Sequence, residues 1–131
     1  MESQHTIFEE IGGRPVVDAI TATFYDLMEA HEPAIARMHP PFDGTIPELS
    51  RAYFADFFAF WTGGPRDYLA TRGHPRLGMR HGHLAIGPAE RDAWLRCMLG
   101  ALDAHVAPGR ARSALEARLS QVAHFLQSPE A

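Results

Sequence analysis

The chain has 131 residues, of which 46% are hydrophobic and 21% charged, and its mean hydropathy is −0.19. This composition is typical of a folded protein with one domain, residues 1–131, rather than of a disordered or fibrous chain. A formal net charge of −4 argues against a general nucleic-acid binder and against attraction to anionic lipid.

The cellular setting follows from cysteine usage and from the length of the apolar runs. Cys97 is the single cysteine, so no disulfide can form within the chain. The apolar runs are a few residues long, whereas a membrane span needs about 20. No charged start leads into a short apolar run with a small-residue cleavage site. The sequence therefore predicts a cytoplasmic protein without a membrane span.

The first half of the chain has helical hydrophobic periodicity, interrupted by glycine and proline. A short segment around Ile7 to Ile11 ends at Gly12-Gly13, and a helix is expected from there to about His31. A short helix has room between Pro33 and Met38. Because no run of β-branched residues with period 2 occurs, we predict an all-α fold.

The next helix is expected to begin near Pro47 and to end at Gly63-Gly64-Pro65. Its apolar residues are dense enough that two of its faces should be covered, by protein or by a ligand: Leu49, Tyr53, Phe54, Phe57, Phe58, Phe60 and Trp61. This excess of aromatic surface is the first indication of a bound ligand.

Two long helices are expected to close the chain, roughly Pro88 to Val106 and Arg110 to Gln127. Their inward residues are predicted to be Trp94, Leu95, Cys97, Met98, Leu99, Ala101 and Leu102 in the first helix, and Leu115, Leu119, Val122 and Leu126 in the second. Cys97 has core spacing and no plausible base beside it, so we interpret it as a packing residue.

The segment from Arg72 to His83 concentrates arginine and histidine between glycines. Arginine forks bind carboxylates and imidazole is a common metal ligand, so a haem, which carries both acid groups and a metal, fits this composition. A solvated basic loop is the alternative. Zinc is a weaker one, since His-Glu-x-x-His and paired cysteines are absent from the sequence.

Five ordered blocks of residues resemble the truncated haemoglobins, and within them the second group, from Ile7 to about Leu126. The blocks are Ile11-Gly12-Gly13, Phe24-Tyr25, Trp61-Thr62-Gly63-Gly64-Pro65, the run from Arg72 to His81, and the run from Ile86 to Met98. The resemblance implies a two-over-two helical sandwich around haem b, iron protoporphyrin IX.

The resemblance also implies the residues that bind the haem. His81 matches the proximal histidine that binds the iron, and Arg80 matches the arginine that faces a propionate. Tyr68, Leu77 and Ile86 are expected to contact the haem.

On the opposite, distal face, Tyr25 and Trp94 match the family's hydrogen-bond donors, and a phenol O–H and an indole N–H suit that role. Ser50 would stand at the haem entrance and Phe54 above the ring. His39 departs from the more common phenylalanine or tyrosine. It could donate a third hydrogen bond, hold Tyr25 by accepting one, or bind the iron, and we favour hydrogen bonding because two prolines stiffen the loop that follows.

The resemblance implies a haem protein that reversibly binds dioxygen, nitric oxide or another small diatomic ligand, with nitric-oxide dioxygenation as the expected chemistry at Tyr25, Trp94 and His39. The sequence contains no flavin or nicotinamide motif, so turnover would need an unidentified external electron donor. A peroxidase-like haem enzyme and a gas sensor without catalysis are the alternatives. A helical interaction module is a third and would be colourless.

Overall fold

The computed structural model describes residues 6–65 and 86–126. Within these ranges the chain forms α-helices and no strand, as predicted for an all-α protein. The helices are α1 (Ile7–Ile11), α2 (Arg14–His31), α3 (Pro33–Ala36), α4 (Glu48–Trp61), α7 (Pro88–His105) and α8 (Arg110–Leu126).

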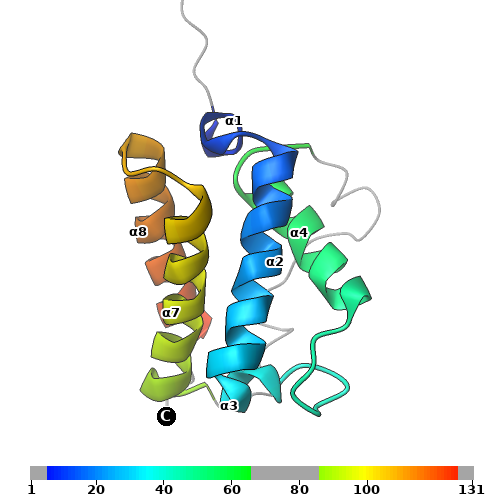
Figure 1. The fold of residues 1–131 in the computed structure, drawn as a ribbon. Coiled ribbons are helices and arrows are strands. Elements are labelled where there is room, and N and C mark those ends of the chain that lie inside the picture. The colour runs from blue at the N-terminus through cyan, green and yellow to red at the C-terminus, as the bar shows by residue number, and fades with distance from the viewer. Residues whose placement is uncertain (1–5, 66–85, 127–131) are drawn as a thin grey trace, which may run out of the picture.

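Helix α2 is the central element of the described part (Figure 1). It packs against α7 on one side and α4 on the other, and α8 packs on α7. The short helix α1 contacts α8, and α3 contacts both α2 and α7. Residues of α2 therefore face α4 and α7 at once, which makes α2 the helix that can supply a site between them.

The boundary between α1 and α2 is where the sequence predicts it. Thr6 and Glu9 form a reciprocal capping box at the start of α1, with the Glu9 N–H donating to the Thr6 hydroxyl at 3.1 Å. Gly12 and Gly13 have φ values of 121° and 75°, which side-chain-bearing residues rarely adopt. The glycine pair thus lets the chain reverse between the two helices.

The end of α4 is joined closely to α1. The Phe8 N–H donates to the Thr62 carbonyl at 3.0 Å. A Cβ added to Gly64 would lie 2.7 Å from the Ala59 carbonyl oxygen, so only glycine fits without displacing backbone. The break predicted at Gly63-Gly64-Pro65 therefore has a packing role as well as ending the helix.

Two leucines predicted to face inward or be covered are instead exposed. Leu99 of α7 is 36% exposed and Leu49 of α4 is 74% exposed. In α7 the buried stripe is made largely of small or flexible residues (Ala93, Cys97, Met98, Ala101 and Leu102), which let α2 approach closely and leave Leu99 outside the contact. Leu49 lies about 140° around the helix from Phe54.

Arginine side chains join the helices at their ends, and none of the 12 basic residues of the chain is lysine. The Arg118 guanidinium of α8 lies 4.3 Å from the centroid of the Trp61 ring and donates to the Trp61 carbonyl at 3.1 Å. Arg96 of α7 binds the Glu32 carboxylate with two nitrogens, at 2.9 and 3.2 Å. These planar forks tie α8 to α4 and α7 to the end of α2.

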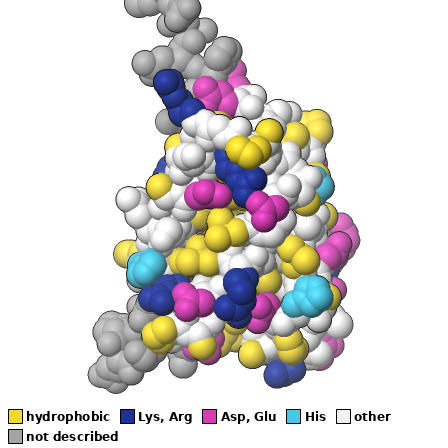
Figure 2. Space-filling model, turned by 60° about the vertical axis from the view of Figure 1, so that its left-hand side comes forward, with side chains coloured by type: hydrophobic (Ala, Val, Ile, Leu, Met, Phe, Trp, Pro, Cys, Tyr) yellow, Lys and Arg dark blue, Asp and Glu magenta, His cyan; other side chains and the backbone are white. Residues whose placement is uncertain are grey.

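Figure 2 shows the face on the α7 and α8 side of the molecule. Acidic and arginine side chains are intermingled there, with hydrophobic side chains among them. Charges of both signs therefore share this face. In the described ranges, no helix combines the length and apolarity that crossing a membrane requires.

Candidate functional site

Five rings from four segments meet beside α2, and we call Phe24, Tyr25, His39, Phe54 and Trp94 the aromatic cluster. The Phe24 and Tyr25 ring centroids are 4.8 Å apart. The Phe54 ring of α4 lies 5.4 Å from Phe24 and 5.6 Å from Tyr25, and the Trp94 ring of α7 meets Phe24 edge-on at 5.6 Å. Three helices thus bring together residues that are far apart in the sequence.

The hydroxyl of Tyr25 is the unusual group in this cluster. Tyr25 is 5% exposed, yet its O–H has no hydrogen-bond partner among the described residues. A buried hydroxyl without a partner costs about 1–3 kcal/mol, and a buried tyrosine normally avoids that cost by finding one. The cluster therefore holds a donor whose partner is not among the described residues.

Burial also fixes the protonation state of Tyr25. Desolvation raises the pKa of the phenol well above its ordinary value, and the nearby Arg51 charge lowers it by less. The phenol stays neutral across the physiological pH range and keeps its proton. Its oxygen can therefore donate a hydrogen bond at every such pH.

Trp94 supplies a second donor in the same cluster, where its ring packs against Phe24. Its side chain is half-buried, and within the described part of the chain its indole N–H makes no hydrogen bond. Because indole N–H can only donate, Trp94 and Tyr25 together offer two donors and no negative charge. Such a pair suits a small ligand that carries partial negative charge.

His39 stands edge-on to Tyr25, with the ring centroids 5.8 Å apart. Its Nδ1 lies 2.9 Å from the Ile35 carbonyl oxygen. Because a carbonyl can only accept, Nδ1 carries the proton, and Nε2 of the neutral ring is an acceptor. This tautomer suits accepting a hydrogen bond; donation from Nε2 would need the charged imidazolium.

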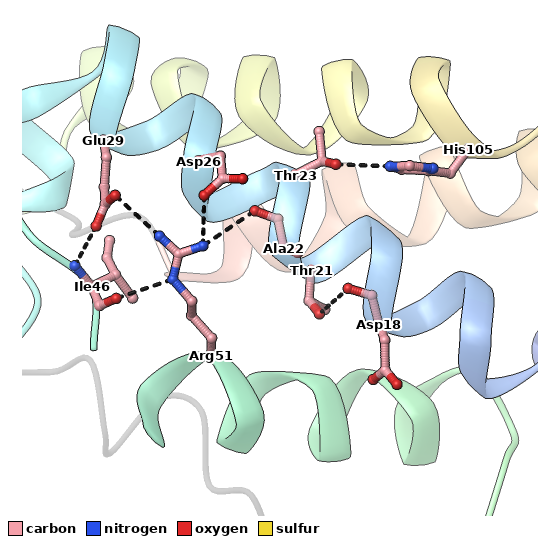
Figure 3. Close-up of polar contacts among 9 residues, drawn as sticks. All are labelled: Asp18, Thr21, Ala22, Thr23, Asp26, Glu29, Ile46, Arg51 and His105. Carbon is pink, nitrogen blue, oxygen red and sulfur yellow. Dashed lines mark hydrogen bonds and ion pairs between the residues drawn. The ribbon is translucent and has the colours of Figure 1, made fainter. Parts of the chain in front are cut away.

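Arg51, which the sequence did not single out, lies beside the cluster, with its guanidinium carbon 5.7 Å from the Tyr25 ring centroid. Figure 3 shows its polar contacts. Its guanidinium donates to Asp26 at 2.8 Å, to the Ile46 carbonyl at 3.0 Å and to the Ala22 carbonyl at 3.4 Å, and pairs with Glu29 at 3.1 Å. Burial alone would lower the pKa of Arg51, but the carboxylates of Asp26 and Glu29 together raise it by more than burial lowers it. The net shift is upward, so the guanidinium stays charged. Asp26 and Glu29, three positions apart on α2, are the only sequence signal for this contact.

The other predicted site residues divide into described and undescribed positions. Ser50 is half-buried in the first turn of α4, one position before Arg51, and Ile86 is half-buried just before α7. Phe54 is half-buried within the cluster. Tyr68, Leu77, Arg80 and His81 lie outside the described residues.

The described residues fit the distal side of a haem pocket. They provide aromatic walls, a buried phenol without a partner among the described residues, and an indole donor, and the Tyr25 and Trp94 rings both pack against Phe24. In residues 6–65 and 86–126 no group of three or more His, Cys, Asp or Glu side chains is placed to hold a metal ion. A haem iron needs one protein ligand, and the predicted one, His81, lies outside those ranges.

Cys97 is 3% exposed in the core and takes no part in the cluster. Burial, and secondarily the charge of Glu32, raise the pKa of its thiol to about 11. The thiol is therefore protonated at neutral pH, as expected for a packing residue.

Comparisons with known proteins agree with this geometry. The bacterial-like globin family matches residues 6–128. A group 2 truncated haemoglobin of Bacillus subtilis (strain 168) is 31% identical, with 99% of this chain and 95% of the relative covered.

Two solved structures are similar along nearly their whole length. The group II two-on-two haemoglobin of Agrobacterium tumefaciens is 37% identical, covers 98% of each chain and has a TM-score of 0.85. The haemoglobin of Chloroflexus aurantiacus is 38% identical, covers 95% of this chain and 99% of its own, and has a TM-score of 0.86. The predicted two-over-two globin fold is confirmed, and the chain belongs to the bacterial-like globins and, within them, to the group II truncated haemoglobins.

Proposed function

We propose that this chain binds haem b and holds dioxygen or another small diatomic ligand against Tyr25 and Trp94. Membership of the globins implies a haem cofactor and diatomic ligands. The observation that carries the distal assignment is the buried Tyr25 hydroxyl, which has no hydrogen-bond partner among the described residues. A ligand with a partly negative outer atom would satisfy that donor.

The proximal assignment rests on the sequence. His81 is proposed as the single iron ligand, with Arg80 paired to a propionate. Tyr68, Leu77 and Ile86 are proposed to contact the porphyrin. When bound, the haem supplies a ferrous iron that binds dioxygen reversibly and can give up one electron.

On the distal side, Tyr25 and Trp94 donate to the ligand. Each hydrogen bond is worth about 1.5 kcal/mol if the ligand carries partial charge, which is roughly tenfold in its dissociation rate. Phe54 has no donor and limits the volume that the ligand can occupy. Ser50 is a small residue at the proposed entrance and leaves it open.

We propose that His39 acts on the ligand through Tyr25 rather than by binding iron. Nδ1 of His39 is engaged with the Ile35 carbonyl, and the ring lies edge-on to Tyr25. The edge-on His39 ring limits how far the Tyr25 ring can turn, and so keeps the phenol O–H directed toward the ligand.

Nitric-oxide dioxygenation is the reaction we propose for the loaded protein. Nitric oxide and dioxygen combine to give nitrate, with one electron taken from ferrous haem. Two neutral donors favour this step because they retain dioxygen without adding a charge of their own beside it. If bound, the haem would supply that electron, and an unidentified external electron donor would have to return it. A cytoplasmic location stays a prediction.

The distal assignment is tested by the dioxygen dissociation rate of the haem-loaded protein. Tyr25→Phe and Trp94→Phe are each expected to raise it about tenfold. Trp61→Phe is the matched control, because Trp61 is the only other tryptophan and stacks under Arg118 at the far end of α4. Equal rates in wild type, Tyr25→Phe and Trp94→Phe would contradict the proposed donors.

A further inference from the structure

The side chain of Arg51 is only 16% exposed and has four acceptors, three on α2 and one in the loop before α4. Two are the carboxylates of Asp26 and Glu29 on α2, and two are the carbonyl oxygens of Ala22 and Ile46. Figure 3 shows the guanidinium between these groups. A planar fork with five N–H donors can bind acceptors in several directions at once, which a lysine ammonium on a flexible stem does not reproduce.

These contacts join three segments of the chain. Arg51 belongs to the first turn of α4, its carboxylate partners belong to α2, and Ile46 is in the loop that leads into α4. Glu29 also accepts the Ile46 N–H at 2.6 Å, and Ile46 itself is 4% exposed. The start of α4 and its preceding loop are thus held to one face of α2.

That face of α2 carries Tyr25. Ala22, Asp26 and Glu29 lie three residues before, one after and four after Tyr25. The guanidinium carbon of Arg51 is 5.7 Å from the Tyr25 ring centroid, within reach of a cation–π contact. Three residues further along α4, Phe54 meets the same ring edge-on at 5.6 Å.

Tyr25 is therefore contacted from α4 by Arg51 and by Phe54, and only the Arg51 contact is anchored by hydrogen bonds to α2. If that anchor is lost, the first turn of α4 is released from α2, and with it the packing that fixes the phenol. A donor that moves by a fraction of an ångström loses much of its hydrogen bond, because the bond weakens steeply with distance and angle.

We propose that Arg51 is a positioning residue for the distal side, which holds α4 against α2 and so determines how firmly Tyr25 retains a diatomic ligand. This inference rests on the proposed donor role of Tyr25. It does not require Arg51 to contact the ligand or the haem.

The test uses the full haem-loaded chain with Arg51→Gln and Arg51→Lys. Both variants are expected to raise the dioxygen dissociation rate about three- to tenfold, the factor for weakening one hydrogen bond. In the carbon monoxide complex, the iron–carbon stretch seen by resonance Raman should shift or broaden, because it responds to donors near the ligand. The dissociation rate of Arg51→Lys should not return to the wild-type value, because a positive charge alone does not reproduce the hydrogen bonds of the guanidinium.

Arg14→Gln is the matched control. Arg14 also joins α2 to α4, through Asp56 at 2.9 Å, and pairs with Asp18 of its own helix at 2.7 Å, but it lies at the other end of α2 and is 44% exposed. Its loss should change the dissociation rate less than about twofold and leave the stretch unchanged. An equal effect from both arginines would overturn the proposal, because any loss of an α2–α4 tie would then suffice.

A double-mutant cycle with Tyr25→Phe separates this inference from the function on which it rests. If Arg51 acts through Tyr25, Arg51→Gln changes the dissociation rate in the wild-type background and not in Tyr25→Phe. The same factor in both backgrounds, or no effect in either, overturns the role of Arg51. No effect of Tyr25→Phe itself overturns the proposed function instead.

If Arg51→Gln does not take up haem, Asp26→Asn serves in its place. Asp26 is 69% exposed, so its neutralisation removes one partner of Arg51 without disturbing the core. It is expected to raise the dissociation rate about twofold in the wild-type background only, in line with weakening one partly exposed ion pair. An unchanged rate in this variant would count against the proposal.

Discussion

Tyr25→Phe is expected to have opposite effects on stability and on ligand retention. The substitution removes one oxygen from a side chain that is 5% exposed and leaves the ring contacts with Phe24 at 4.8 Å and Phe54 at 5.6 Å in place. Because the hydroxyl has no partner among the described residues, its removal ends a desolvation cost of about 1–3 kcal/mol. The free energy of unfolding of the haem-free protein should therefore rise by about 1 kcal/mol or more.

Urea unfolding of the haem-free protein, followed by far-ultraviolet circular dichroism, measures this change. Thr62→Val is the control, because Thr62 is 2% exposed and its hydroxyl donates to the Phe58 carbonyl at 2.8 Å. Losing that satisfied hydroxyl should lower the free energy of unfolding by about 0.5–1.5 kcal/mol. A loss of stability in Tyr25→Phe as large as in Thr62→Val would refute the reasoning, since it would mean that the phenol has a partner within the protein.

Further predictions concern packing, the thiol and the proximal ligand. Gly64→Ala places a Cβ 2.7 Å from the Ala59 carbonyl oxygen and should lower the free energy of unfolding by about 1–3 kcal/mol; an unchanged urea midpoint would contradict the close approach. Because burial raises the pKa of Cys97 to about 11, its thiol stays protonated at pH 8, so iodoacetamide should label the native protein slowly at that pH and quickly in denaturant. Fast labelling of the native protein would show that the thiol is accessible. His81→Ala should abolish stable haem uptake, and a wild-type ferrous spectrum in that variant would show that another residue binds the iron.

Much of the fold could be read from local signals. Glycine pairs and prolines mark the helix ends. The structure requires glycine in both pairs: Gly12 and Gly13 have positive φ, and Gly64 lies too close to the Ala59 carbonyl oxygen for a Cβ. The resemblance named Tyr25 and Trp94 as distal donors. The structure adds that both side chains gather around Phe24.

The remaining features depend on contacts between helices, which periodicity does not report. Leu99 has core spacing but faces outward, because small residues on α7 already fill the contact with α2. The tautomer of His39 is fixed by the Ile35 carbonyl, which sequence cannot reveal. Arg51 looks like an ordinary exposed charge until α2 and α4 are packed together.

The central claim, that this chain is a haem protein, is tested most directly by adding haemin to the purified protein and recording its visible spectrum. We predict that the Soret band shifts from its position in free haemin and that the change saturates at one haem per chain. A Soret band that stays where free haemin absorbs, at every ratio of haemin to protein, would contradict the account.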